Sequence, residues 1–408
     1  MIHSKLITFL TAFLCITTLV YAQEWADWRG PNRDAVWNEN GIVEKFQSAE
    51  IPHKWSVEIG AGYSGPTVSI GKVYVMDLLN DPKQTEGVLC FDEQTGEKIW
   101  EYRYECEYSG VGYPAGPRAS VVIDDGKAYS LGTMGHLYCF NADNGEVIWE
   151  KDLNERYEIN MPIWGIASTP LIVDEKIVVH VSGSSNACVV AFNQNSCEEI
   201  WRNLDDRAGY SAPVIIEKNG VRVIVNWTEH SLSGLNPETG AIYWRFPWET
   251  GSGMSIATPV LYDDYIFVSA FYSGSLLVKL GNDYKTAEKV WQREGESERK
   301  TDALHCVMNT PVIINDYIYG VDSYGELRCL ELLTGNRVWE NQTAVKRDRW
   351  ANIHFIQNGD KIWMFNEQGE LLITKLSSDG FTEICRTKLI EPTRKQHPRG
   401  VTWSHPAF

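Results

Sequence analysis

Aromatic residues and cations recur at one position of this chain, just before short runs of Val, Ile and Pro. The residues at this position are Tyr63, Arg118, Trp164, Tyr210, His305, Trp350 and Trp403, with Arg349, His405, Trp227, Glu229 and His230 close by in the sequence. Such rings and cations could bind a planar anion, a sugar or a peptide segment through stacking and cation–π contacts. The alternative is that the rings only pack loops and that Arg118 pairs with a carboxylate. Arg118 is the strongest single candidate, because a cation buried near the centre of an acidic protein needs a partner.

The sequence lacks the motifs of several enzyme classes. It has no G-x-S-x-G, H-E-x-x-H or C-x-x-C-H, and no two cysteines are adjacent. No loop has the density of carboxylates that calcium prefers, and no His, Cys or Asp cluster has metal-ligand spacing. His136, His180 and His354 are therefore interpreted as histidines satisfied within the core. We expect no catalytic residue and no metal site.

A sheet motif that ends in tryptophan repeats along the chain, and it must position these residues. Examples are DEQTGEKIW, NADNGEVIW and NPETGAIYW, and successive tryptophans stand 43 to 52 residues apart. The repeated tryptophans are Trp55, Trp100, Trp149, Trp201, Trp244, Trp291 and Trp339, while Cys385 takes the place of one in the last copy. We expect each ring to fill the space between neighbouring units and to have no chemical role.

Each repeat predicts four short strands. A second motif such as STPLIVDEKIVVHV or NTPVIINDYIYGVD opens each unit, and its Val, Ile and Tyr residues alternate with period two. One sheet of this size cannot bury both faces alone, whereas a ring of sheets can. The sequence predicts an all-β fold, a β-propeller of four-stranded blades, with eight blades and the closing one incomplete. HKWSVEI and the terminal SHPAF would share that blade, and its missing strands suggested a truncated gene product.

The N-terminus has the pattern of a secretory signal. Lys5 precedes an apolar run from Leu6 to Val20, and small Ala22 stands before Gln23. We expect a signal peptide at 1–22, an N-terminal extension at 23–52, and one propeller domain at 53–408, with no transmembrane segment in the mature chain. The net charge of −17 argues against nucleic-acid binding. Export permits disulfides, and Cys188 and Cys197, which flank one hairpin, are the one candidate pair for a disulfide.

The turn (A/N)-x-(D/N)-x-x-(T/N)-G-x-x-x-W resembles that of pyrroloquinoline-quinone-like (PQQ-like) propeller repeats. WADWRGPNRDAVW, YPAGPRAS and VTWSHPAF resemble segments of secreted bacterial PQQ-binding-like β-propeller proteins. This resemblance implies a fold like that of quinoprotein alcohol dehydrogenases. It leaves the function open, because the superfamily includes both quinoprotein dehydrogenases and non-enzymatic scaffolds, such as the propeller subunit of the outer-membrane β-barrel assembly machinery.

Quinoprotein alcohol dehydrogenases hold PQQ under a disulfide of adjacent cysteines, with a calcium site of Glu and Asn and an Asp base. The adjacent cysteines are absent here, and the other features match no position. We therefore expect an exported bacterial protein, periplasmic or extracellular, that is a non-catalytic binding or assembly scaffold without a cofactor. A protein partner, a polysaccharide or a small ligand would bind at the loop face. The alternatives are a PQQ- and calcium-dependent alcohol or sugar dehydrogenase and a carbohydrate-binding propeller.

Overall fold

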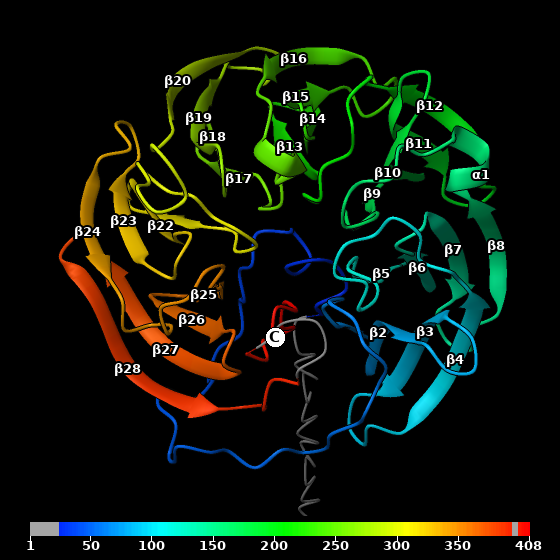
Figure 1. Ribbon diagram of the computed structural model, residues 1–408, viewed down its shortest axis with the longest axis horizontal. Helices are drawn as coiled ribbons and strands as arrows, with labels where there is room; N and C mark the ends of the chain where they lie inside the picture. The colour runs from blue at the N-terminus through cyan, green and yellow to red at the C-terminus, as the bar shows by residue number, and fades with distance from the viewer. Residues whose placement is uncertain (1–23, 394–398) are drawn as a thin grey trace, which may run out of the picture.

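Seven four-stranded antiparallel sheets form a ring in the computed structural model, which describes residues 24–393 and 399–408. The expected signal peptide lies outside the described residues. Within each sheet the strands follow in sequence order, the first nearest the axis and the fourth at the rim (Figure 1). The prediction of a propeller built from four-stranded blades is confirmed.

The blades are numbered in chain order. Blade 1 comprises β1 (Thr67–Ser69), β2 (Lys72–Leu79), β3 (Thr85–Asp92) and β4 (Lys98–Glu105), and blade 2 comprises β5 (Val122–Asp124), β6 (Lys127–Leu131), β7 (His136–Asn141) and β8 (Val147–Asp152). Blade 3 comprises β9 (Leu171–Val173), β10 (Lys176–Gly183), β11 (Ala187–Asn193) and β12 (Glu199–Asn203), and blade 4 comprises β13 (Val214–Lys218), β14 (Val221–Trp227), β15 (Ser231–Leu235) and β16 (Ile242–Pro247). Blade 5 comprises β17 (Val260–Tyr262), β18 (Tyr265–Ala270), β19 (Gly274–Leu280) and β20 (Ala287–Arg293). Blade 6 comprises β21 (Val312–Ile314), β22 (Tyr317–Val321), β23 (Leu327–Glu331) and β24 (Arg337–Asn341). Blade 7 comprises β25 (Ile353–Asn358), β26 (Lys361–Asn366), β27 (Glu370–Ser377) and β28 (Gly380–Lys388). Two short helices, α1 (Leu153–Tyr157) and the 3₁₀ turn η1 (Gly251–Gly253), lie in connecting loops.

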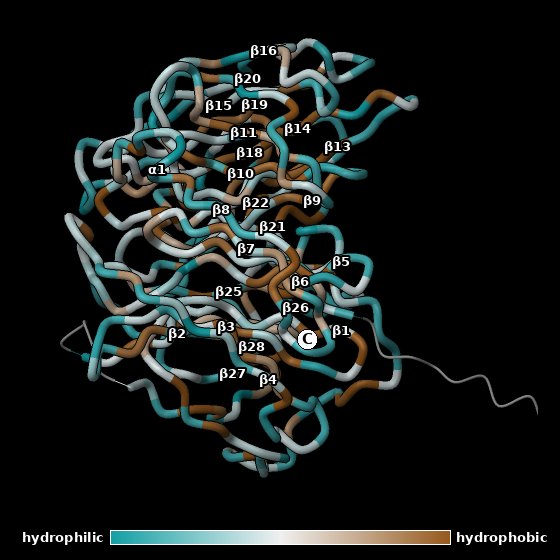
Figure 2. Tube along the Cα trace, turned by 90° about the vertical axis from the view of Figure 1, so that its right-hand side faces the viewer, coloured by the Kyte–Doolittle hydropathy of each residue, from teal (hydrophilic) through white to brown (hydrophobic). Residues whose placement is uncertain are grey.

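Hydrophobic residues follow the strands through the interior, and polar residues cover the turns (Figure 2). In blades 1 to 4 and 6, the residue before the bulge between the third and fourth strands is small and pairs with the blade tryptophan, as in Cys90 with Trp100 and Cys139 with Trp149. These cysteines are completely buried and serve as small core residues. All eight cysteines of the described chain are thiols, including Cys188 and Cys197.

The blade tryptophans join each blade to the next one. The indole N–H of Trp100 donates to the carbonyl of Ala142 at 3.0 Å, and that of Trp201 donates to the carbonyl of Pro237 at 3.0 Å. Each acceptor lies in the turn before the fourth strand of the next blade. The glycine of that turn has a positive φ, and a Cβ on Gly145 would lie 2.7 Å from the Trp100 ring. The T-G and W motifs of the repeat are thus two halves of one contact between blades.

The sector between blades 7 and 1 contains no sheet within the described residues. Trp55 still donates to the carbonyl of Glu93 in blade 1, at 2.8 Å, so it makes the contact of a blade tryptophan without a strand around it. On the other side, Trp37 and Phe408 pack against Trp363 of blade 7. The two terminal segments therefore close the ring, as expected, although they do so as irregular chain (Figure 1).

The segment from Trp25 to Trp37 crosses the axis of the ring. Trp25 pairs with Val68 of blade 1, and Val36 pairs with Gln357 of blade 7. Between them the buried Arg33 donates to the carbonyl of Pro213 at 2.8 Å and forms an ion pair with Asp27 at 2.8 Å. This segment closes the axial channel and gives the cavity above it a floor.

Candidate functional site

A cavity of about 280 Å³ occupies the loop end of the axis. Its wall comes mainly from residues that lead into the first strands of successive blades. They include Tyr63, Arg118, Trp164, Tyr210, Trp350 and Trp403. Six of the seven residues expected at the mouth of the channel are thus brought together, and His305 is the exception. The floor includes Trp28, whose indole N–H donates to the hydroxyl of Thr258 at 2.9 Å.

Arg118 is the one cation among the described residues that line this cavity. Its guanidinium donates to the carbonyls of Tyr113 at 2.7 Å, Gly116 at 2.8 Å and Gly112 at 3.1 Å. It also lies over the Tyr63 ring, 5.1 Å from the ring centre. Burial lowers the pKa of Arg118, and nearby tyrosines oppose that shift. Within the described chain, no carboxylate forms an ion pair with it, so the alternative of an Arg118–carboxylate pair is wrong.

The remaining lining is mostly aromatic and apolar, and Thr169, Ser252 and the buried His354 are its polar exceptions. Trp164 and Tyr210 pack with ring centres 5.1 Å apart, and Met254 and Met308 also line the cavity. Aromatic rings and an arginine are the residue types that dominate the centres of protein–protein interfaces. The cavity thus offers a cation inside an apolar wall, which suits an apolar segment that carries an anionic group.

Arg349 lies at the rim, where its guanidinium sits 4.4 Å from the centre of the Trp350 ring. An ion pair with Glu298 at 2.5 Å fixes this position. His230 is half-buried, with its Nδ1 4.0 Å from Asp206. These two residues are near enough to the loop face to take part in binding, and that role stays a prediction.

Trp227, His305 and His405 are buried and do not line the cavity. Trp227 stacks on Trp248 inside blade 4, with ring centres 5.6 Å apart. His305 donates from Nδ1 to the carbonyl of Phe271 and accepts the N–H of Gly295 at Nε2. Their positions in the sequence did not show that these three side chains are buried.

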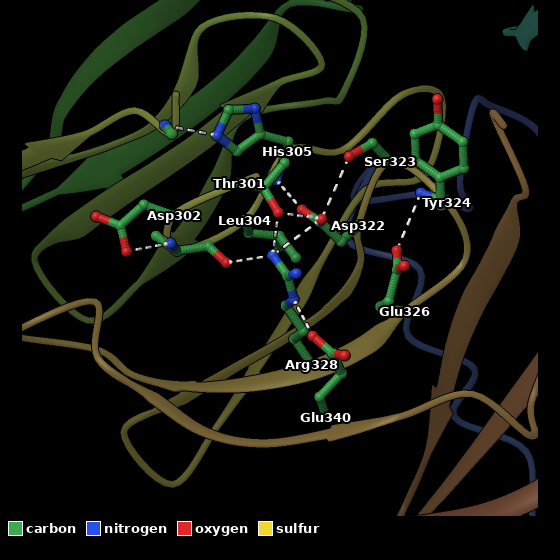
Figure 3. Close-up of polar contacts among 12 residues, drawn as sticks. Thr301, Asp302, Leu304, His305, Asp322, Ser323, Tyr324, Glu326, Arg328 and Glu340 are labelled. Carbon is green, nitrogen blue, oxygen red and sulfur yellow. Dashed lines mark hydrogen bonds and ion pairs between the residues drawn. The ribbon is translucent and has the colours of Figure 1, made fainter. Parts of the chain in front are cut away.

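Beside the cavity, a second hollow contains a buried ion-pair network (Figure 3). Asp322 accepts from the backbone N–H of His305 at 2.6 Å and pairs with Arg328 at 2.9 Å. Arg328 also pairs with Glu340 at 2.9 Å and donates to the hydroxyl of Thr301 at 2.8 Å. Because these polar groups have partners within the chain, the network holds the loop before blade 6 in place and leaves little to bind a ligand.

The cavity does not fit calcium-bound PQQ. Its described lining contains no Asp, Glu, Asn or Gln side chain, and these are the oxygen donors that hold calcium in proteins. It contains no cysteine either. The same lack leaves no carboxylate to serve as a general base. The aromatic rings and Arg118 alone could face a planar anion, but the metal and base chemistry of a quinoprotein has no residues here.

The sequence missed the floor of the cavity. Trp28, Arg29 and Arg33 belong to the opening WADWRGPNRDAVW, which has no place in the repeat. Arg29 is buried, and burial lowers its pKa to about 10 while Asp34 opposes the shift. The sequence did contain one signal that this segment is buried. Its arginines stand between tryptophans, and an exposed extension rarely needs such large aromatic residues.

The ring of repeats and its aromatic cavity define a propeller of the PQQ-like class. A family model described as "Outer membrane protein assembly factor BamB" matches residues 84–341, and the chain belongs to this family. The chain is 25% identical over 287 residues to the outer membrane protein assembly factor BamB of Yersinia pestis, a match that covers 67% of this chain and 66% of the relative. It therefore spans slightly less than two thirds of that relative's length.

Solved structures share the fold at lower sequence identity. BamB from Moraxella catarrhalis superposes with a TM-score of 0.54 at 16% identity, covering 80% of this chain and 85% of that one. A europium-containing methanol dehydrogenase superposes with a TM-score of 0.67 at 12% identity, covering 90% and 86%. At these identities the likeness establishes the propeller fold alone. None of the helices in the described ranges has the length and apolar character needed to cross a membrane.

Proposed function

We propose that this protein is an exported, non-catalytic propeller that acts as an assembly scaffold in the bacterial envelope, on the periplasmic side of the outer membrane. Membership of a family described by outer membrane protein assembly supports a scaffold role. The observation that carries the proposal is the cavity itself, which has aromatic walls, one arginine and no acid–base pair in its described lining. These features suit binding without chemistry.

The partner in this proposal is a protein that inserts an apolar segment with an acidic side chain or a terminal carboxylate. Arg118 would bind the anionic group, and the aromatic walls would cover the apolar part. The carbonyls that already hold Arg118 fix its position before a partner arrives, which reduces the entropy lost on binding. The rim residues Arg349 and Trp350 would contact the flanks of the segment.

Photo-cross-linking in the native host tests this role. A photoreactive phenylalanine analogue at Trp164 should capture an outer-membrane assembly protein, and the same analogue at Asp143, in a turn on the opposite face, should not. The substitution Arg118→Met should reduce the captured amount at least tenfold, as expected when a buried charged contact is lost. Equal capture at both positions would contradict the proposal.

A quinoprotein dehydrogenase is the second candidate, and the structural likeness to a methanol dehydrogenase is the observation that favours it. Because a ligand that binds only the folded state raises its melting temperature, PQQ with calcium should leave that temperature unchanged if the scaffold proposal is right. A rise with one quinone per chain would replace the scaffold with an oxidoreductase. A rise with oligosaccharides alone would instead favour the carbohydrate-binding alternative.

A further inference from the structure

Three potential metal ligands meet between blades 1 and 2, although they lie far apart in the sequence. Glu86 is in β3, Cys106 follows β4, and His136 begins β7. One ligand atom from each lies within 4.8 Å of the others, and the Cys106 Sγ is 3.8 Å from the His136 Nδ1. Ligand atoms around a tetrahedral zinc ion are about 3.3 to 3.8 Å apart, given its usual bond lengths. Only small side-chain movements would bring these three atoms onto one ion.

Glu86 is a completely buried carboxylate without a cation beside it. It accepts the hydroxyl of Tyr104 at 2.5 Å, the hydroxyl of Tyr108, and the N–H of Thr133 at 3.0 Å. No lysine or arginine of the described chain forms an ion pair with it, and its charge makes only a small contribution to the pKa of Arg118. A buried charge without a counter-charge is costly, and a bound cation would remove that cost.

His136 is oriented as a ligand would be. Its Nδ1 faces the Cys106 sulfur, while its Nε2 lies 3.9 Å from Asp152. A carboxylate behind a metal-bound histidine is the usual outer partner, because it fixes the ring and its tautomer. The His136 side chain is 24% exposed, so an ion can reach this ligand from solvent.

We propose that Glu86, Cys106 and His136 form a binding site for a borderline-soft divalent cation of the Zn²⁺ type. A thiolate with an imidazole selects such a cation over calcium or magnesium. On binding, the Cys106 thiol releases its proton to solvent and its sulfur bonds to the ion. One thiolate, one carboxylate and a neutral imidazole then balance the two positive charges, and a water molecule completes the tetrahedron.

The site lies at the base of the segment that forms one wall of the cavity. Cys106 begins the connection whose Gly112 and Tyr113 carbonyls hold Arg118. Tyr108, in the same connection, donates its hydroxyl to Glu86, and its oxygen lies 2.7 Å from the hydroxyl of Thr133, which can donate to it. A bound ion would tie this connection to both blades. The inference stands apart from the proposed scaffold function, because metal binding is measured without any partner.

Cobalt titration of the metal-free full chain tests the proposal. Co²⁺ should bind at one ion per chain and produce the near-ultraviolet absorption of a cobalt–thiolate bond, and Zn²⁺ should displace it and raise the melting temperature. Cys106→Ser should abolish that absorption, whereas the matched variant Cys385→Ser, at a partly exposed cysteine of β28, should retain it. His136→Gln should weaken zinc binding at least 100-fold, and His230→Gln should not.

The substitution Asp152→Asn tests whether Asp152 supports His136 as a metal ligand or only caps α1. One Asp152 oxygen caps α1 by accepting the N–H of Asn154 at 2.9 Å, and the amide oxygen of asparagine can keep that bond. The loss of charge behind His136 should weaken zinc binding about 10- to 100-fold. Absence of the thiolate absorption in the parent protein, or its persistence in Cys106→Ser, would overturn the proposal.

Discussion

Two connections between blades are each held by a buried carboxylate, and the two carboxylates differ in their surroundings. Asp322 holds the connection before blade 6, where it accepts the hydroxyl of Thr301 and pairs with Arg328 (Figure 3). Glu86 holds the connection before blade 2, where it accepts the hydroxyl of Tyr108 and has no cation within ion-pair distance in the described chain. Both residues are at most 1% exposed.

The difference separates a structural site from one that can take a ligand. At Asp322 the chain supplies its own counter-charge, so the site is complete once the protein folds. At Glu86 the chain supplies neutral donors on one side and two potential metal ligands on the other. Buried His180 shows a third way to accommodate an ionisable side chain in the interior. It is kept uncharged, and its ring N–H donates to Asn226 at 3.1 Å.

The largest effect is expected from removing one partner of the complete pair. Arg328→Met should lower the free energy of unfolding by about 3–5 kcal/mol, because it leaves Asp322 buried and charged. Arg386→Met is the matched control and should cost less than about 1 kcal/mol, since the partly exposed Arg386 on the outer strand β28 pairs with Glu370 of β27. Denaturant unfolding measures both, and equal losses would show that Asp322 does not depend on Arg328.

A pH titration of stability should reveal that His180 is uncharged in the folded protein. Burial lowers the pKa of His180 from 6.5 to about 4, although the hydrogen bond to Asn226 opposes the shift. Because the unfolded chain takes up a proton at higher pH than the folded one, stability is lost as the pH falls. From pH 7 to 5 this one residue should cost about 2 kcal/mol.

His180→Gln should remove that part of the acid dependence, and His230→Gln, at a half-buried position, should retain it. The melting temperature of the three proteins, measured from pH 7 to 5, gives the comparison. An unchanged slope in His180→Gln would mean that other groups cause the acid sensitivity.

The repeat carried most of the fold prediction. Each blade tryptophan and the T-G turn that receives it are local motifs, so spacing alone located the blades and their order. Six wall residues of the cavity were also predictable, because the residues that lead into the first strands lie near the axis, although the His305 side chain turns away from the cavity. Arg118 was therefore found from its position in the repeat.

Features outside the repeat could not be predicted in this way. Trp28 and Arg33 reach the axis because an irregular segment crosses the ring, and no periodicity describes that path. Glu86, Cys106 and His136 occupy three different positions of two repeats, so no short motif unites them. Trp227 and His305 show the remaining limit, because loop position in the sequence does not tell which way a side chain turns.

The smallest effect on the metal-free protein is expected at Glu86, and it is the sharpest test of the comparison. Glu86→Gln leaves no arginine stranded and relieves the cost of a buried charge, so its weakened hydrogen bonds should lower the free energy of unfolding by about 1 kcal/mol at most. The matched change Asp322→Asn removes the buried partner of Arg328, leaves it only the partly exposed Glu340, and should cost about 3 kcal/mol. With zinc present, Glu86→Gln should also lose the metal-induced rise in melting temperature, whereas Asp322→Asn should retain it. Equal losses without metal would mean that Glu86 has a counter-charge after all, and the two connections would then be built alike.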